Sequence, residues 1–132
     1  MNIDEVYIKP TEKTPEFVLN PKGIIKIRGR AIDENFRKAP EQIMHWIDSY
    51  LLNPVDITEI IIALEYLNSF NTIILTSILR KLSQVTQRSK KLVVKWYIEN
   101  DDDDMLDRGE SISSAFDIPI EFIMTVDIKS WY

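Results

Sequence analysis

The residues best suited to chemistry lie in one short run, "LEYLNSFNT", over residues 64–72. It contains two hydroxyl residues, Ser69 and Thr72. Two asparagines, Asn68 and Asn71, accompany them. A β-branched apolar segment precedes the run, and apolar residues at helical spacing follow it. We therefore expect these side chains where a buried strand ends and a helix begins.

Two interpretations of Ser69 are compatible with that position. Asn68 or Ser69 can be the N-cap of the helix, which would stabilise the fold by about 1 kcal/mol. Alternatively, Ser69 accepts a phosphate, because free N–H groups and a positive partial charge at a helix start tolerate an anion. Phosphorylation adds about −1.5 to −2 charges, enough to change how a partner docks. The residues alone leave both interpretations open.

Most other catalytic chemistry is excluded by the residues present. The glycines Gly23, Gly29 and Gly109 form neither a GxGxxG nor a P-loop pattern. His45 is the single histidine and there is no cysteine, which excludes multi-histidine metal sites, thiolate sites and disulfides. The strand before the run ends in residues 65–68, without the acceptor aspartate of a two-component receiver. We expect a protein that is not an enzyme and holds no cofactor.

Four consecutive aspartates, Asp101–Asp104, form the most strongly charged run. Carboxylates can bind a hard cation, but consecutive side chains diverge and no EF-hand spacing follows. Acidic residues are favourable at the start of a helix. We expect a solvated loop that caps the next helix, and no metal site. An enzyme that uses Glu65 and this run on a metal-bound substrate is disfavoured for the same reason.

Length and composition indicate one domain over residues 1–132, of which 45% are apolar. A chain of this size buries roughly two-thirds of its surface on folding. The net charge of −5 disfavours general nucleic-acid binding, which needs clustered Lys and Arg. The apolar runs are far shorter than the ~20 residues of a membrane span, and no secretion signal opens the chain. We expect a cytoplasmic protein that binds neither nucleic acid nor membrane.

Strands and helices alternate along the chain. Residues 1–15, charged and interrupted by two prolines, are expected to be a loosely extended lead-in. A hairpin follows, with strands over 17–19 and 24–30 and an "NPKG" turn between them. The next predicted elements are helix 40–51, strand 56–64, helix 72–88, strand 91–99, helix 105–116 and strand 120–128. The order ββαβαβαβ predicts an α/β fold, a mixed β-sheet with helices packed mainly on one face.

The run "LEYLNSFNT" resembles the signature of the SiaC family of bacterial regulatory phosphoproteins, formerly a domain of unknown function. Two further segments extend the resemblance over nearly the whole chain. The segment "TPEFVLNPKGIIKIRGRAIDENFRKAPEQIMHWIDSYL" is similar to the family's opening hairpin and tryptophan-containing helix. The segment "LVVKWYIENDDDDMLDRGESISSAFDIPIEF" is similar to its closing strand, acidic loop and "F..PFEF" ending.

The resemblance implies a STAS-like fold, akin to the anti-sigma-factor antagonists, and a non-enzymatic partner switch. Carried over by position, Ser69 is the phosphoryl acceptor. A histidine-kinase-like Ser/Thr kinase adds the phosphate, and a PP2C-type phosphatase removes it. The unphosphorylated form binds an effector protein such as a diguanylate cyclase, which it activates.

The surface expected to bind these partners surrounds Ser69 and consists of Glu65, Asn68, Phe70, Asn71 and Thr72. Phe70 replaces a small hydroxyl residue of the family, and we favour a docking role for it. Ile73 stands where lysine is common. The alternative function is a constitutive interaction or scaffold domain in which Ser69 is only a helix cap.

Overall fold

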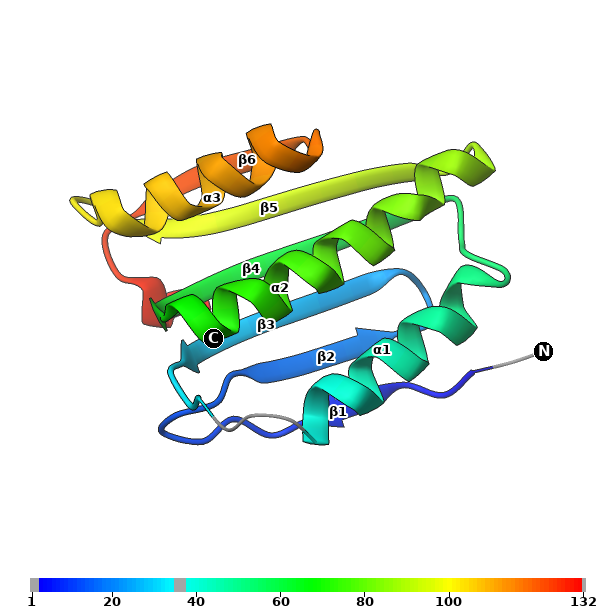
Figure 1. Cartoon of the computed structure of the whole chain (residues 1–132), viewed down its shortest axis with the longest axis horizontal. Helices are drawn as coiled ribbons and strands as arrows, with labels where there is room; N and C mark the ends of the chain where they lie inside the picture. The colour runs from blue at the N-terminus through cyan, green and yellow to red at the C-terminus, as the bar shows by residue number, and fades with distance from the viewer. Residues whose placement is uncertain (1–2, 35–37, 132) are drawn as a thin grey trace.

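The computed structural model describes residues 3–34 and 38–131. Within them, six strands form one sheet in the order β1-β2-β3-β4-β5-β6, and three α-helices lie on one of its faces (Figure 1). The elements are β1 (Val6–Ile8), β2 (Glu16–Asn20), β3 (Ile24–Ala31), α1 (Lys38–Leu51), β4 (Ile57–Leu67), α2 (Ser69–Leu82), β5 (Lys91–Glu99), α3 (Asp103–Phe116) and β6 (Ile120–Thr125), with the 3-10 helices η1 (Ser83–Arg88) and η2 (Ile128–Trp131).

The sheet is mixed because its two halves are connected differently. Strands β1, β2 and β3 are antiparallel neighbours, whereas β3, β4, β5 and β6 run parallel to one another. Each parallel pair requires a crossover, which α1, α2 and α3 supply in turn. Right-handed crossovers that advance in one direction across a sheet place their helices on one face. The predicted mixed sheet with helices on one face is confirmed.

The structure differs from expectation in the lead-in, residues 1–15, where β1 forms a further strand. Val6 lies opposite Leu19 in antiparallel register and packs against the core. The indole N–H of Trp46 donates to the carbonyl of Asp4 at 2.8 Å, which ties this segment to α1. A strand of this length is too short to show alternation in the sequence. The order of strands and α-helices along the chain is therefore βββαβαβαβ rather than ββαβαβαβ.

The main core lies between the sheet and the helices. In β3, Ile25 and Ile27 face it and are buried, while Lys26 and Arg28 point to the other face, as their alternation predicts. Buried side chains from all three helices complete this core, among them Ile43, Trp46, Ile47, Leu75, Ile78, Leu79, Met105 and Ile112.

The face opposite the helices is partly covered by the chain that follows β6. Ile128 of η2 packs with Ala63 and Tyr97, so the central strand β4 is buried on both sides at this point. The backbone N–H of Ile128 donates to Glu99 Oε1 at 3.1 Å. Elsewhere the face of β4 opposite the helices is half-buried or exposed, as at Ile61 and Ile57, so burial on both faces is confined to this part of the strand.

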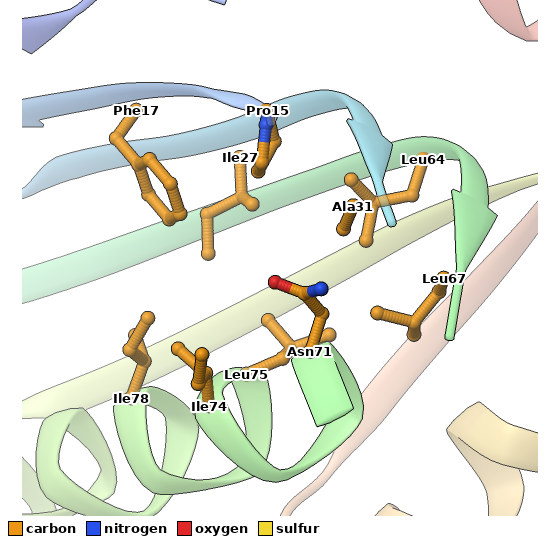
Figure 2. Close-up of a pocket in the computed structure, with 10 residues that line it drawn as sticks. All are labelled: Pro15, Phe17, Ile27, Ala31, Leu64, Leu67, Asn71, Ile74, Leu75 and Ile78. Atoms are coloured by element: carbon orange, nitrogen blue, oxygen red, sulfur yellow. The ribbon is translucent and has the colours of Figure 1, made fainter. Parts of the chain in front are cut away.

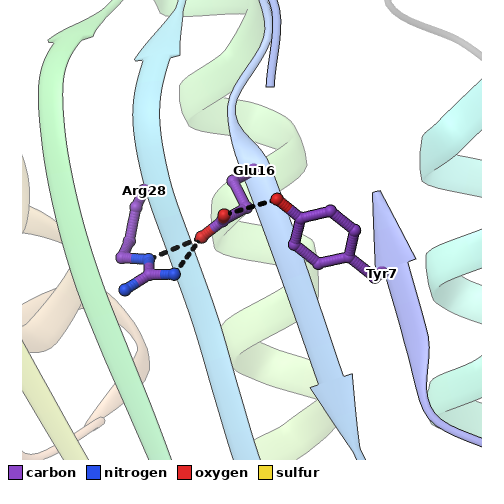
Figure 3. A network of polar contacts seen from close by, with 3 residues as sticks. All are labelled: Tyr7, Glu16 and Arg28. Atoms are coloured by element: carbon purple, nitrogen blue, oxygen red, sulfur yellow. Dashed lines mark hydrogen bonds and ion pairs between the residues drawn. The ribbon is translucent and has the colours of Figure 1, made fainter. Parts of the chain in front are cut away.

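A polar network crosses the first three strands on the same face (Figure 3). Arg28 Nε donates to Glu16 Oε1 at 2.6 Å, and the two side chains form an ion pair. The Tyr7 hydroxyl donates to Glu16 Oε2 at 2.8 Å. Because this hydrogen bond requires the phenolic proton, the pKa of Tyr7 is raised above its ordinary value of 10.0. The network therefore links β1, β2 and β3 through side chains on the face opposite the helices.

Gly23 closes the turn between β2 and β3, which the "NPKG" motif correctly predicted. Its φ is +91°, and its N–H donates to Asn20 O at 2.9 Å. A Cβ at this position would lie 2.5 Å from Val55 Cγ2 and 2.6 Å from Ile57 O. Position 23 therefore requires glycine for two reasons. Its φ is positive, and Val55 and Ile57 leave no space for a Cβ atom.

Replacing Gly23 should test both requirements. Gly23→Ala is expected to lower the free energy of unfolding by about 2 kcal/mol or more, because backbone strain and overpacking act together. Gly29→Ala is the matched control: its φ is +122°, but its Cβ would lie 3.5 Å from Pro15 Cα, an ordinary contact. Urea denaturation measures both variants. Equal losses would show that the close approach at Gly23 has no energetic effect.

Candidate functional site

Asn68 is the N-cap of α2. Its backbone is extended, with φ −85° and ψ 175°, and its Oδ1 accepts a hydrogen bond from the Asn71 N–H at 2.9 Å. The helix therefore begins at Ser69, earlier than the predicted start at Thr72. Of the two cap candidates the structure selects Asn68, so the interpretation of Ser69 as the helix cap is wrong.

Asn68 and Asn71 together fasten the start of α2 to the segment that follows β3. Asn68 Nδ2 donates to Ile32 O at 2.9 Å. Asn71 Nδ2 donates to Asp33 O at 3.0 Å and to Asn68 Oδ1 at 2.9 Å. Asn71 is 4% exposed. The structure thus places Asn71 beneath the predicted partner surface, where its side chain positions the helix start.

A small cavity lies beneath Asn71, between α2 and the sheet (Figure 2). Its volume is about 10 Å³, room for at most about one water molecule. It is lined by Pro15, Phe17, Ile27, Ala31, Leu64, Leu67, Asn71, Ile74, Leu75 and Ile78. This cavity is far too small for a substrate or cofactor, so the chemistry of the junction belongs to its outer surface.

Ser69 is the first residue of α2, and it is exposed. Within the described ranges 3–34 and 38–131, its hydroxyl takes part in no hydrogen bond. The N-terminus of α2, with the positive end of its dipole, lies at the same place. An exposed, uncommitted hydroxyl at this position is accessible to an enzyme that transfers a group to it.

Thr72 and Phe70 occupy the first turn of α2 with Ser69. Thr72 Oγ1 donates to Asn68 O at 2.7 Å and accepts a hydrogen bond from Arg108 Nη1 at 3.2 Å. Phe70 is half-buried. Of the predicted partner-binding residues, those from Asn68 to Thr72 are therefore brought together in one turn.

Glu65 is separated from that turn. Gly29 pairs with Leu64 and Arg30 pairs with Tyr66, so Glu65 is the extra residue of a β-bulge in β4. It contributes to an open groove at the carboxyl ends of β4 and β5, lined by Glu65, Tyr66, Glu99, Asn100, Asp101, Asp102, Asp127 and Lys129. The structure places Glu65 on the flank of the predicted surface.

Two residues close to the start of α2, Ile73 and Arg108, were not among the predicted partner-binding residues. Ile73 is 69% exposed and follows Ser69 by one helical turn. The sequence does indicate that Ile73 is exposed, because it does not belong to the helically spaced apolar residues that face the core. Arg108 belongs to α3, and no local pattern could associate it with Thr72.

The helix-capping role predicted for the aspartate run is confirmed. Asp102 is the N-cap of α3, and its Oδ1 accepts from the Met105 N–H at 3.2 Å. Asp103 and Asp104 occupy the first turn, where the helix dipole favours negative charge. Among the described residues, no group of three or more His, Cys, Asp or Glu side chains is placed to hold a metal ion.

In the part of the chain that the structure describes, no helix is long and apolar enough to cross a membrane.

The model of the SiaC family regulatory phosphoproteins matches residues 8–125. The chain therefore belongs to the SiaC family, whose members are regulators rather than catalysts.

Solved structures show the same fold. Apo-SiaC from Pseudomonas aeruginosa is 20% identical, with a TM-score of 0.80 over 92% of this chain and 99% of that chain. A chain in the crystal structure of the P. aeruginosa diguanylate cyclase SiaD in complex with its activator SiaC is 19% identical, with a TM-score of 0.81 over 91% of this chain and 99% of that chain. No curated protein sequence matches.

The capping geometry predicts different stabilities for two adjacent variants. Asn68→Ala should lower the free energy of unfolding by about 1–2 kcal/mol, because it removes the cap and the bond to Ile32 O. Ser69→Ala should change it by no more than about 0.5 kcal/mol, since the hydroxyl is exposed and unbonded. Urea denaturation of both variants measures the difference. A larger loss for Ser69→Ala would mean that the serine has the structural role.

Proposed function

We propose that this protein is a phosphorylation-controlled switch that binds and activates an effector when Ser69 is unphosphorylated. The observation that carries the proposal is the exposed Ser69 hydroxyl at the start of α2, which forms no hydrogen bond with the described residues. The capping that a serine often provides is already performed by Asn68. The hydroxyl is thus available for modification without loss of a structural bond.

The surroundings of Ser69 explain why a phosphate would block a partner. Ile73, one helical turn from Ser69, is 69% exposed, and such apolar surface gains free energy when a partner covers it. A phosphate there would have to be desolvated on binding, which is costly for an uncompensated charge. The same phosphate is compatible with the folded domain, because it lies at a helix N-terminus. Binding would change while the fold stays intact.

The proposed partners are those that the family resemblance implies. A histidine-kinase-like Ser/Thr kinase and a PP2C-type phosphatase would set the state of Ser69. The effector class, a diguanylate cyclase, is supported by the solved complex of SiaD with its activator SiaC, whose fold this chain shares. In this proposal Phe70 and Ile73 form the contact surface around Ser69, and Asn71 positions it from below.

A constitutive scaffold in which Ser69 only caps the helix is the weaker function. That function assumes that the Ser69 hydroxyl caps the helix. The structure gives that role to Asn68, whose Oδ1 accepts from the Asn71 N–H. No other observation favours a permanent partner.

Phosphate should be found on Ser69 in the native cell. Mass spectrometry of the peptide over residues 65–80, from protein isolated under several growth conditions, is the measurement. Thr72, Thr76 and Ser77 are internal controls, because each hydroxyl donates to a backbone carbonyl and should remain unmodified. An unmodified Ser69 under every condition would contradict the proposal.

Charge at position 69 should control effector binding. We expect Ser69→Asp to weaken binding to a diguanylate cyclase of the source organism by about tenfold or more, equivalent to about 1.4 kcal/mol. Ser69→Ala should bind like the unmodified protein. Ser77→Asp places the same charge on an exposed serine of the same helix and is the matched control. Titration calorimetry gives each affinity, and equal binding by Ser69→Asp and Ser69→Ala would refute the switch.

A further inference from the structure

Arg108 is a half-buried cation that lies against the first turn of α2. Its Nη1 donates to Thr72 Oγ1 at 3.2 Å, and that oxygen is 2.7 Å from the carbonyl oxygen of Asn68, the residue before Ser69. Among the described residues Arg108 forms no ion pair, whereas Arg28 is paired with Glu16. Its charge is therefore held next to the modification site without an anionic partner.

We propose that Arg108 is the receptor for the phosphate on Ser69, so that phosphorylation joins the start of α2 to α3. This inference rests on the proposed function, because it describes how the phosphorylated state is held. The ligand is the phosphoserine of the same chain. In the unmodified protein Arg108 bonds to Thr72, and in the phosphorylated protein it turns to the phosphate.

The helix geometry places the two groups within reach. Ser69 and Thr72 are three residues apart on α2, so their side chains are neighbours, with Cβ atoms roughly 5–6 Å apart. A guanidinium that already contacts Thr72 has only this distance to cover, and its long side chain has the freedom to do so. It offers several N–H donors in a planar fork, the geometry that matches two phosphate oxygens.

The electrostatic balance favours capture over repulsion. Asp107 lines the shallow groove between α2 and α3 together with Thr72 and Arg108, and it opposes a phosphate there. Asp107 is exposed, so water and salt screen its repulsion. Arg108 is half-buried and would contact the phosphate directly through charge-assisted hydrogen bonds, which are the stronger kind.

The consequence for partner binding goes beyond added charge. When Arg108 binds the phosphate, its hydrogen bond to Thr72 is broken. The new contact between Arg108 and the phosphate then spans the groove between α2 and α3. That groove is lined by Thr72, Asp107, Arg108, Ser111, Ile112, Ala115 and Phe116. The phosphorylated protein would then present a different surface here. An aspartate at position 69 would reproduce the charge but only part of the bridge.

The test uses full-length protein with phosphoserine installed at position 69 during synthesis, so neither kinase nor effector is needed. A ³¹P NMR titration follows the second ionisation of the phosphate, whose ordinary pKa is about 6. Arg108 favours the dianion, so Arg108→Gln should raise this pKa by about half a unit or more, a roughly threefold increase in proton affinity. Arg80→Gln is the matched control, because Arg80 stacks on Phe116 at 4.5 Å, farther along the same pair of helices.

An unchanged phosphate pKa in Arg108→Gln, or an equal rise in Arg80→Gln, would overturn the assignment. Arg108→Lys is the second variant should the glutamine variant fold poorly, and it should give an intermediate pKa, because it keeps the charge but loses the fork. These results are independent of the proposed function. If Ser69 carried no phosphate in cells, the proposed switch would be wrong, but the NMR result would be unaffected. If Arg108 did not bind the phosphate, the proposed phosphorylation of Ser69 would be unaffected.

Discussion

The side-chain amide of Asn68 is the interaction on which the geometry of the site depends. Its oxygen accepts two N–H groups of Asn71, and its nitrogen donates to Ile32 O. One residue thus terminates β4, starts α2 and holds the segment after β3 against both. Because Asn68 caps the helix start, the exposed Ser69 hydroxyl is not needed as a cap. A hydrophobic residue at position 68 could do none of this.

In the proposed switch, recognition would take place on the outside of the molecule. Beneath the start of α2, apolar side chains leave only a cavity of about 10 Å³, and Asn71 is the polar member of its lining. On the outside, Ile73 exposes apolar surface one helical turn from the serine. A rigid base beneath a modifiable surface lets a covalent change alter docking while the packing stays the same. This division suits a regulator that must remain folded in both states, in keeping with membership of the SiaC family.

The sequence predicts those features that a local pattern expresses. Alternation in β3 and the apolar run of β4 were sufficient to place both strands, and "NPKG" identified the turn at Gly23. The cap was ambiguous because asparagine and serine are equally good at that position, and only the backbone geometry distinguishes them. The strand β1 is too short to alternate visibly. Arg108 was beyond sequence reasoning, because its contact with Thr72 spans two helices that are separated in the chain.

The chain order of the sheet has a consequence for folding. Since every strand pairs with its predecessor, each new strand emerging from a ribosome finds its partner already made. Each parallel pair must still close the loop formed by its helical crossover, so these pairings form more slowly than the antiparallel pairs of β1, β2 and β3. The part of the chain from β1 to α2 would fold before α3 is synthesised. Ser69 and the hydrogen bonds of Asn68 and Asn71 beside it would therefore form early. Arg108 arrives with the last helix, and the surroundings of the serine would be complete only when synthesis is nearly finished.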